Sequence, residues 1–290
     1  MSYQDIFTIT NYARQAMLLE VSATPKPGLV DRLNSGAHKD MNYHTFLTSS
    51  NSVFKGLYSC ALEGATFKEN GGPKLLARLR EIGKECENNM LRATGGVNTH
   101  KGLIFSFGIL LAATARLMEN GMKLGYEGSS EIICEEVKRI TKGLSRGDFQ
   151  DLSHKKKPTH GESIYVNYGI KGIRGEVEEG FPTVMHKGLP LFKKKDIKEL
   201  GLNSVLLQVL MTFIAYNQDT NIIFRGGMEG LSYAQEEAYS FLSSGGVYNK
   251  EYYRYLSDLN DKFIEKNISP GGSADLLAVA IFLAFADGLL

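Results

Sequence analysis

The chain has 290 residues, 43% of them hydrophobic, which is enough to bury a sizeable core and is typical of a globular protein. Its 33 Lys and Arg residues almost balance its 32 Asp and Glu residues, so the formal net charge is only +1. The protein therefore has no overall positive electrostatic field that would favour binding to nucleic acid or to an anionic membrane, and we expect neither as a partner.

Apolar residues recur with helical spacing along most of the chain, and residue types that suit helix starts precede several of these segments. Pro73 suits a first helical position, while Asn98 and Ser273 suit N-caps. The stripes are formed by Ile6, Ile9, Ala13 and Ala16; Leu75, Leu79, Ile82 and Cys86; Ile133, Val137, Ile140 and Leu144; Leu206, Leu210 and Phe213; and Tyr252, Leu256, Leu259 and Phe263.

Two segments, 103–118 and the helix expected from Ser273 onwards, are apolar on more than one face, as are central helices of a bundle. The apolar run 276–286 is shorter than the roughly 20 residues of a membrane span. Only 164–168 alternates like a strand, and we expect a helical turn or loop there, because a lone strand has no pairing partner. The sequence predicts an all-α fold, a single compact bundle-like domain over residues 1–290, with a mobile connection at 144–160.

Three cysteines, Cys60, Cys86 and Cys134, are widely spaced, form no CxxC pair and follow no secretory leader. Structural zinc needs closely spaced ligand pairs, and no histidine stands within a few positions of these cysteines. We expect them to be core residues of a cytoplasmic protein.

Four Gly-punctuated polar segments interrupt the helical pattern: TPKPGLVDRLNSGAH at 24–38, GVNTHKG at 96–102, DTNIIFRGG at 219–227 and SPGGSADLL at 269–277. Each by itself reads as an ordinary helix-capping turn. Their number and their cationic residues instead favour a single assembled binding site.

Several of these residues suit phosphate binding. Free amides at a helix N-terminus attract anions, which makes the segment around Gly271, Gly272 and Ser273 a candidate, with a plain Ser N-cap as the alternative. Lysine binds phosphate as a point charge, and arginine binds it through two parallel N–H donors of its guanidinium. The further candidates are Thr99, His100 and Lys101 in the second segment, and Arg225, Gly226 and Gly227 in the third.

Oxygen ligands for Mg²⁺ stand at Asp219, Asn221 and Asp275. A capping carboxylate is the alternative for Asp219. His160 and Glu162, in THGE, are placed to move protons if their environment shifts their pKa values. The residues thus predict a helical protein that binds a polyphosphate with Mg²⁺, and they leave the reaction open.

Taken together, the segments TPKPGLVDRLNSGAHKDM, GVNTHKG, THGE, DTN with RGG, and SPGGSADLL resemble the triphosphoribosyl-dephospho-CoA synthase family, in the family's order and from about residue 15 onwards. The resemblance implies an all-helical enzyme that makes the prosthetic-group precursor of citrate lyase, with a close relative that serves malonate decarboxylase. In the implied reaction the ribose 2′-hydroxyl of 3′-dephospho-CoA attacks the anomeric carbon of ATP, and adenine leaves. A separate transferase would then attach the product to an acyl carrier protein.

This reaction builds positive charge on the ribose and negative charge on the adenine, so it needs carboxylates, a proton donor and a base. The resemblance places Asp31 or Glu162 as the base, with His160 as a further catalytic residue, and Asp219, Asn221 and Asp275 at the metal. Arg174 and Glu176 of RGEVEEG read alternatively as a surface ion pair. The remaining substrate-binding candidates are Lys26, Arg32, Asn34, His38, Thr99, His100, Lys101, Arg174, Glu176, Arg225, Gly226, Gly227, Gly271, Gly272 and Ser273.

Two alternative functions, from other classes of protein, remain beside this transferase function. A Mg²⁺-dependent helical glycohydrolase of ADP-ribose or a related glycoside could use similar Asp and Asn clusters, and it would release adenine or ribose products without an acceptor. A non-catalytic helical binding module would release no adenine at all.

Overall fold

A computed structural model describes residues 2–69, 71–150, 152 and 158–290, and its regular structure there is helical, with no strand. The first half contains α1 (Tyr3–Ser22), α2 (Tyr43–Thr66), α3 (Gly72–Ala93), α4 (Lys101–Glu119), α5 (Ser129–Thr141), α6 (Leu144–Phe149), α7 (His160–Tyr168) and α8 (Ile173–Glu178). The second half contains a π-helix (Val184–Gly188), α9 (Leu189–Phe192), α10 (Lys195–Glu199), α11 (Leu202–Tyr216), α12 (Thr220–Ser243), a 3₁₀ turn (Gly246–Tyr248), α13 (Tyr252–Glu265) and α14 (Gly271–Ala286). The prediction of an all-α fold is confirmed.

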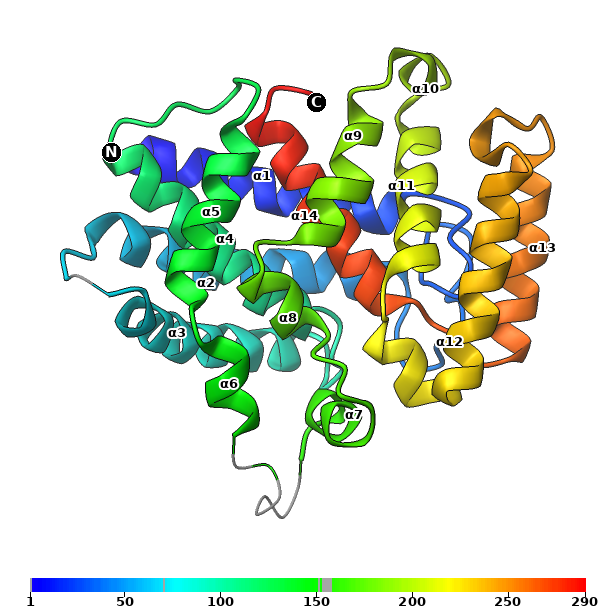
Figure 1. The fold of residues 1–290 in the computed structure, drawn as a ribbon, viewed down its shortest axis with the longest axis horizontal. Coiled ribbons are helices and arrows are strands. Elements are labelled where there is room, and N and C mark those ends of the chain that lie inside the picture. Colours follow the sequence, from blue (N-terminus) through cyan, green and yellow to red (C-terminus); the bar gives the residue numbers. More distant parts are fainter. Residues whose placement is uncertain (1, 70, 151, 153–157) are drawn as a thin grey trace.

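Two helices, α4 and α14, form the centre of the molecule (Figure 1). Helix α14 packs against α1, α4, α5, α9, α11 and α12, and α4 packs against α2, α3 and α5. Because neighbours surround them, both are apolar on more than one face, as predicted. By length and composition alone α4 could cross a membrane, but 67% of its most apolar window is buried in the protein.

The outer helices are amphipathic and turn their predicted stripes inward. Ile6, Ile9, Ala13 and Ala16 of α1 are all buried, and so are the stripes of α3, α5 and α13 except Ile82 and Tyr252, which are partly buried. All three cysteines are free and buried, as predicted, and burial raises the pKa of each thiol to about 12. Residues 164–168 form the end of α7, so the rejection of a strand there is confirmed.

Two predicted helix starts need correction. Asn98 accepts a hydrogen bond from the Lys101 N–H, but α4 begins only at Lys101, with His100 at the cap position. Ser273 is the third residue of α14 rather than its N-cap. Helix α6 occupies 144–149 of the predicted connection, and the lysine run 155–157 lies outside the described residues.

Candidate functional site

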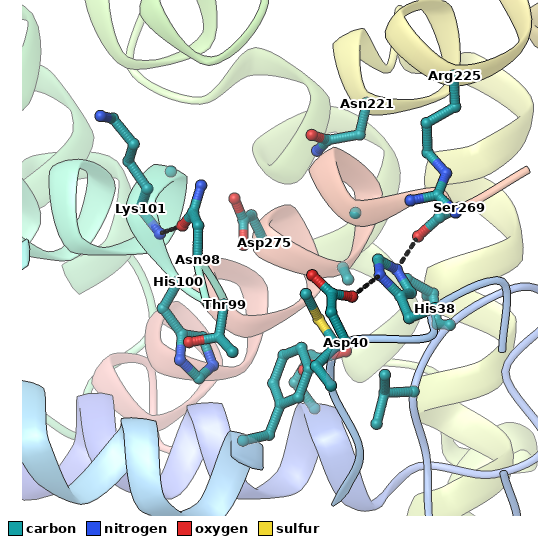
Figure 2. Close-up of a pocket in the computed structure, with 18 of the residues that line it drawn as sticks. His38, Asp40, Asn98, Thr99, His100, Lys101, Asn221, Arg225, Ser269 and Asp275 are labelled. Atoms are coloured by element: carbon teal, nitrogen blue, oxygen red, sulfur yellow. Dashed lines mark hydrogen bonds and ion pairs between the residues drawn. The ribbon is translucent and has the colours of Figure 1, made fainter. Parts of the chain in front are cut away.

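A cleft with a volume of about 270 Å³ lies where four chain segments meet: the loop between α1 and α2, the start of α4, the start of α12 and the start of α14 (Figure 2). These are the four polar segments that the sequence predicts to form one site. The predicted site residues that line it are Lys26, His38, Thr99, His100, Lys101, His160, Asn221, Arg225, Gly271 and Asp275.

The loop 24–38 is shaped from within by Asp31, which is 2% exposed. One oxygen of its carboxylate accepts hydrogen bonds from the Thr24 hydroxyl and the Lys26 N–H, at 2.8 and 2.9 Å. The other accepts from the N–H groups of Leu33 and Asn34, at 2.7 and 3.1 Å. Asp31 therefore holds the loop closed and does not line the cleft, so this geometry does not support its predicted role as the base.

A buried ion pair between Lys26 and Glu20 lines one wall of the cleft, with side chains 1% and 6% exposed. Lys26 comes from the loop, and Glu20 comes from the inward face of α1. Burial raises the pKa of Glu20, and the charge of Lys26 opposes that rise. Because Lys26 is already neutralised, it is less available to a phosphate than the sequence suggests.

Asp275, in the first turn of α14, points its carboxylate into the cleft (Figure 2). It accepts no hydrogen bond and forms no ion pair with any described residue. Surrounding protein, with the nearby charges of Glu20 and Asp219, raises its pKa well above the ordinary value. Gly102 of α4 makes room for it, since a Cβ there would collide with the Asp275 Oδ2. Asp275 is thus a carboxyl group that faces the cleft without a partner among the described residues.

His100 lines the cleft at the start of α4 and is 2% exposed. Its Nδ1 lies 2.6 Å from the Ser49 hydroxyl, which accepts a hydrogen bond from the Thr99 hydroxyl. Its Nε2 is buried and has no partner among the described residues. Burial and the charge of Lys26 lower the pKa of His100 to about 3, so the ring is neutral at physiological pH.

The cleft mouth is lined by polar groups that already bind one another. His38 Nε2 lies 2.8 Å from the Ser269 hydroxyl, and His38 Nδ1 lies 3.8 Å from Asp40 (Figure 2). The Arg225 guanidinium donates to the carbonyl oxygens of Ala37 and Asn267, and so connects α12 to the loop and to the segment between α13 and α14. On the same rim the rings of His160 and Phe224 stack in parallel, with centroids 3.4 Å apart.

Comparison with known proteins identifies the chain. The family model described as ATP:dephospho-CoA triphosphoribosyl transferase matches residues 6–289. The chain belongs to this family. A Klebsiella pneumoniae protein named 2-(5''-triphosphoribosyl)-3'-dephosphocoenzyme-A synthase is 40% identical over 97% of this chain and 92% of its own length. A Salmonella choleraesuis protein named "Probable 2-(5''-triphosphoribosyl)-3'-dephosphocoenzyme-A synthase 1" is 42% identical over 93% of this chain and 88% of its own length.

The fold is shared with a crystal structure described as that of a "putative triphosphoribosyl-dephospho-coA synthase from Archaeoglobus fulgidus". The two superpose with a TM-score of 0.52 at 17% sequence identity, covering 84% of this chain and all of that one. The predicted family and transferase class are confirmed, and the chain is a triphosphoribosyl transferase of this family.

In this member of the triphosphoribosyl transferase family, Asp219, one of the three residues predicted to bind a metal, directs its carboxylate at groups of the protein itself. Asp219 is 1% exposed, and its carboxylate accepts from the N–H groups of Asn221, Gly272 and Ser273 and from the Ser273 hydroxyl, at 2.9, 3.2, 2.7 and 2.9 Å. It therefore caps α12 and α14 together. Among the described residues no group of three His, Cys, Asp or Glu side chains is placed to hold a metal.

The same contacts correct the phosphate prediction for α14. The N–H groups of Gly272 and Ser273, which we expected to hold a substrate phosphate, donate to Asp219 instead. The anion at this helix N-terminus is the protein's own carboxylate. Gly271 alone of the three predicted residues lines the cleft.

The remaining predicted residues of this transferase lie outside the cleft lining. Glu162 completes a capping box with Thr159 at the start of α7, and Glu176 accepts hydrogen bonds from Thr183 while burial raises its pKa. Arg174 pairs with Asp148 at 2.7 Å. The others are Arg32, which is exposed; Asn34, whose side chain accepts from the Gly36 N–H; and Gly226 and Gly227, the second of which breaks the α12 helix with a φ of 67°.

Sequence reasoning missed several residues that line the cleft, among them Glu20, Asp40 and Phe224. Glu20 carries a detectable signal, because it stands four residues after Ala16 on the apolar stripe of α1, where a charge needs a buried partner. Asp40 and Phe224 carry none, because both acquire their place only through the fold.

Proposed function

We propose that this chain transfers the triphosphoribosyl group of ATP to the ribose 2′-hydroxyl of 3′-dephospho-CoA, with release of adenine, and that the cleft holds the reacting atoms. Family membership supports the reaction. The location of the reaction is supported by the Asp275 carboxylate. It has no partner among the described residues, and it faces a cleft to which all four polar segments contribute.

Asp275 is our candidate for the general base. The attacking hydroxyl must lose a proton as the new glycosidic bond forms, and a carboxylate with a raised pKa is a stronger base once it is ionised. Its negative charge would also stabilise the positive charge that develops on the ribose ring. Glu20 is less suited to this task, because Lys26 already occupies its carboxylate.

His100 is our candidate for a neutral hydrogen-bond donor to the substrate. Because the Ser49 oxygen accepts from Thr99, its own proton is free to go to His100 Nδ1. The ring proton then lies on Nε2, the buried atom without a partner. A phosphate or ribose oxygen placed against Nε2 would satisfy it.

Departure of adenine requires a proton, and His160, at the cleft rim, is the candidate donor, because an imidazole N–H can donate a hydrogen bond or a proton to a leaving base. The Phe224 ring, 53% exposed, stacks with the imidazole at the cleft rim and offers an apolar surface to a planar base. Lys101, Arg225 and His38 lie where the phosphates of ATP would approach the mouth.

The test is mass spectrometry of purified protein with ATP and Mg²⁺, with and without 3′-dephospho-CoA, for the parent and for Asp275→Asn. We expect free adenine and triphosphoribosylated dephospho-CoA in equal amounts, and only with the acceptor. Asp275→Asn should lower kcat by about 10²–10⁴-fold, while isothermal titration shows retained ATP binding. Asp258→Asn, on the exposed side of α13, is the matched control and should keep parental turnover.

Each other result contradicts a defined part of the proposal. Adenine without the acceptor would indicate a glycohydrolase, and ADP would indicate phosphoryl transfer. Turnover of Asp275→Asn within threefold of the parent would place the base elsewhere.

We propose in addition that the enzyme acts in the cytoplasm and that its product becomes the prosthetic group of citrate lyase through a separate transferase acting on an acyl carrier protein. Malonate decarboxylase is the alternative destination. Adding the purified product, each candidate carrier protein and its transferase, and measuring the mass of the carrier, would distinguish the two.

A further inference from the structure

A second groove, with a volume of about 520 Å³, runs between α3 and α4 and ends at residues of α6 and α8. We propose that this α3–α4 groove binds the pantetheine arm of the acceptor, the uncharged chain of two amides, a gem-dimethyl group and a thiol. The inference rests on the proposed function, since it extends the acceptor from the cleft into the groove.

The groove adjoins the cleft. Lys101 and Gly102, the first residues of α4, line both, so one turn of helix is the wall that the two spaces share. An acceptor whose ribose lies at Asp275 would pass its pyrophosphate by Lys101 and lead its arm directly into the groove.

The lining matches the chemistry of that arm. Its floor is apolar, and its charged rim groups are paired: Asp148 accepts from both Arg80 and Arg174, at 2.6 and 2.7 Å, and Lys101 contacts Glu87 at 2.6 Å. Paired charges favour a neutral ligand with amide groups over a second polyanion. The apolar lining residues are Leu76, Leu79, Ile104, Phe105, Ile109 and Ile173.

Gly83 gives an independent indication that the groove is kept open. It lies inside α3 with an ordinary helical φ, where glycine costs about 1 kcal/mol relative to alanine. No described atom lies within 4 Å of a Cβ added there, so no packing contact within the protein explains why this position has no side chain. Because Gly83 lines the groove, an occupant of the groove explains it.

The experiment compares Gly83→Trp and Gly83→Ala with Asn88→Trp, a control on the same helix at an exposed position whose side chain makes no hydrogen bond with a described residue. Isothermal titration with 3′-dephospho-CoA and with ATP, and steady-state KM values for both, are the readouts. We expect Gly83→Trp to weaken acceptor binding and raise the acceptor KM at least tenfold, with ATP affinity and ATP KM unchanged. Gly83→Ala and Asn88→Trp should match the parent for both ligands.

Thermal unfolding separates a blocked groove from a damaged fold. The Cβ added at position 83 meets no described atom within 4 Å, and replacing glycine inside a helix favours the helix, so the melting temperature should not fall. Unchanged acceptor affinity in Gly83→Trp, or equal loss for both ligands in a folded variant, would overturn the inference. If the parent binds dephospho-CoA through the groove but releases no adenine, the proposed function fails and the groove assignment stands.

Discussion

Asp219 should be a stability residue rather than a metal ligand, and Asp219→Ala tests this directly. Its carboxylate caps two helices at once, with four hydrogen bonds of 2.7–3.2 Å, and it is 1% exposed, so water cannot replace it. Loss of an N-cap costs about 1–2 kcal/mol, and orphaned buried N–H groups add about 1–3 kcal/mol.

With two helices affected, we expect Asp219→Ala to lower the free energy of unfolding by about 3–5 kcal/mol. For a chain of this size that corresponds to a melting temperature lower by roughly 6–12 °C. Asp219→Asn keeps one carbonyl acceptor and should cost roughly half as much. The assay is urea and thermal unfolding by circular dichroism, with Asp258→Ala as the exposed control, expected within about 0.5 kcal/mol of the parent.

The result that refutes this reasoning is specific. If Asp219→Ala melted at the parental temperature but needed more Mg²⁺ for turnover, the carboxylate would be a metal ligand and its hydrogen bonds would be incidental. A lower melting temperature with an unchanged Mg²⁺ titration supports the capping role.

Further predictions concern the cleft. Asp275 has a raised pKa in the folded state, so the folded protein holds its proton at pH values where the unfolded chain has lost it, and stability falls as pH rises from the ordinary carboxylate pKa through the raised one. Asp275→Asn should therefore gain stability relative to the parent as pH rises across that window, measured by urea unfolding at a series of pH values. Ser49→Ala should release the His100 ring and lower kcat/KM about tenfold, as expected for a lost hydrogen bond of about 1–1.5 kcal/mol. Because it also leaves the buried His100 Nδ1 without its partner, it should lower the free energy of unfolding by about 1–3 kcal/mol. Lys26→Met leaves the Glu20 carboxylate buried and alone and should cost about 3–5 kcal/mol; the double variant with Glu20→Gln should recover part of this loss in a double-mutant cycle.

The fold was largely predictable because hydrophobic periodicity reports burial directly. The stripe of α1 and the all-round apolar α4 and α14 lie where the period places them. Helix starts were less predictable, since Asn98 and Ser273 are good capping residues whose side chains serve neighbouring groups. Local propensity favours a cap, but tertiary contacts choose which residue fills it.

The site was predictable as a set of segments and only partly as a set of roles. All four polar segments meet at the cleft, yet the carboxylate oxygens of Asp31 and Asp219 accept hydrogen bonds from backbone N–H groups. Nothing in the sequence distinguishes a carboxylate that organises a loop from one that faces a substrate, because Asp31, Asp219 and Asp275 all stand in polar segments that contain glycine. Gly272 illustrates this: a Cβ there would lie 2.9 Å from the Asp219 Oδ1, so this glycine admits a side chain of the protein and not a phosphate.

The charge balance of the cleft leads to a last prediction, that ATP binds as its Mg²⁺ complex. The acidic lining residues are Glu20, Asp40 and Asp275, and the basic ones are Lys26, Lys101 and Arg225. Lys26 and Lys101 are already paired with carboxylates, and the lining carries as many acidic side chains as Lys and Arg side chains, so the cleft offers a free triphosphate little uncompensated positive charge. A Mg²⁺ ion bound to the phosphates would supply this positive charge. Such an ion needs no preformed protein site, since Mg²⁺ usually keeps several water ligands and is bound partly by the substrate phosphates. Isothermal titration of ATP should therefore show at least tenfold weaker binding in EDTA than in excess Mg²⁺. Equal affinity in both would mean that the paired lysines open to the triphosphate, and Lys101→Ala would then weaken binding in EDTA.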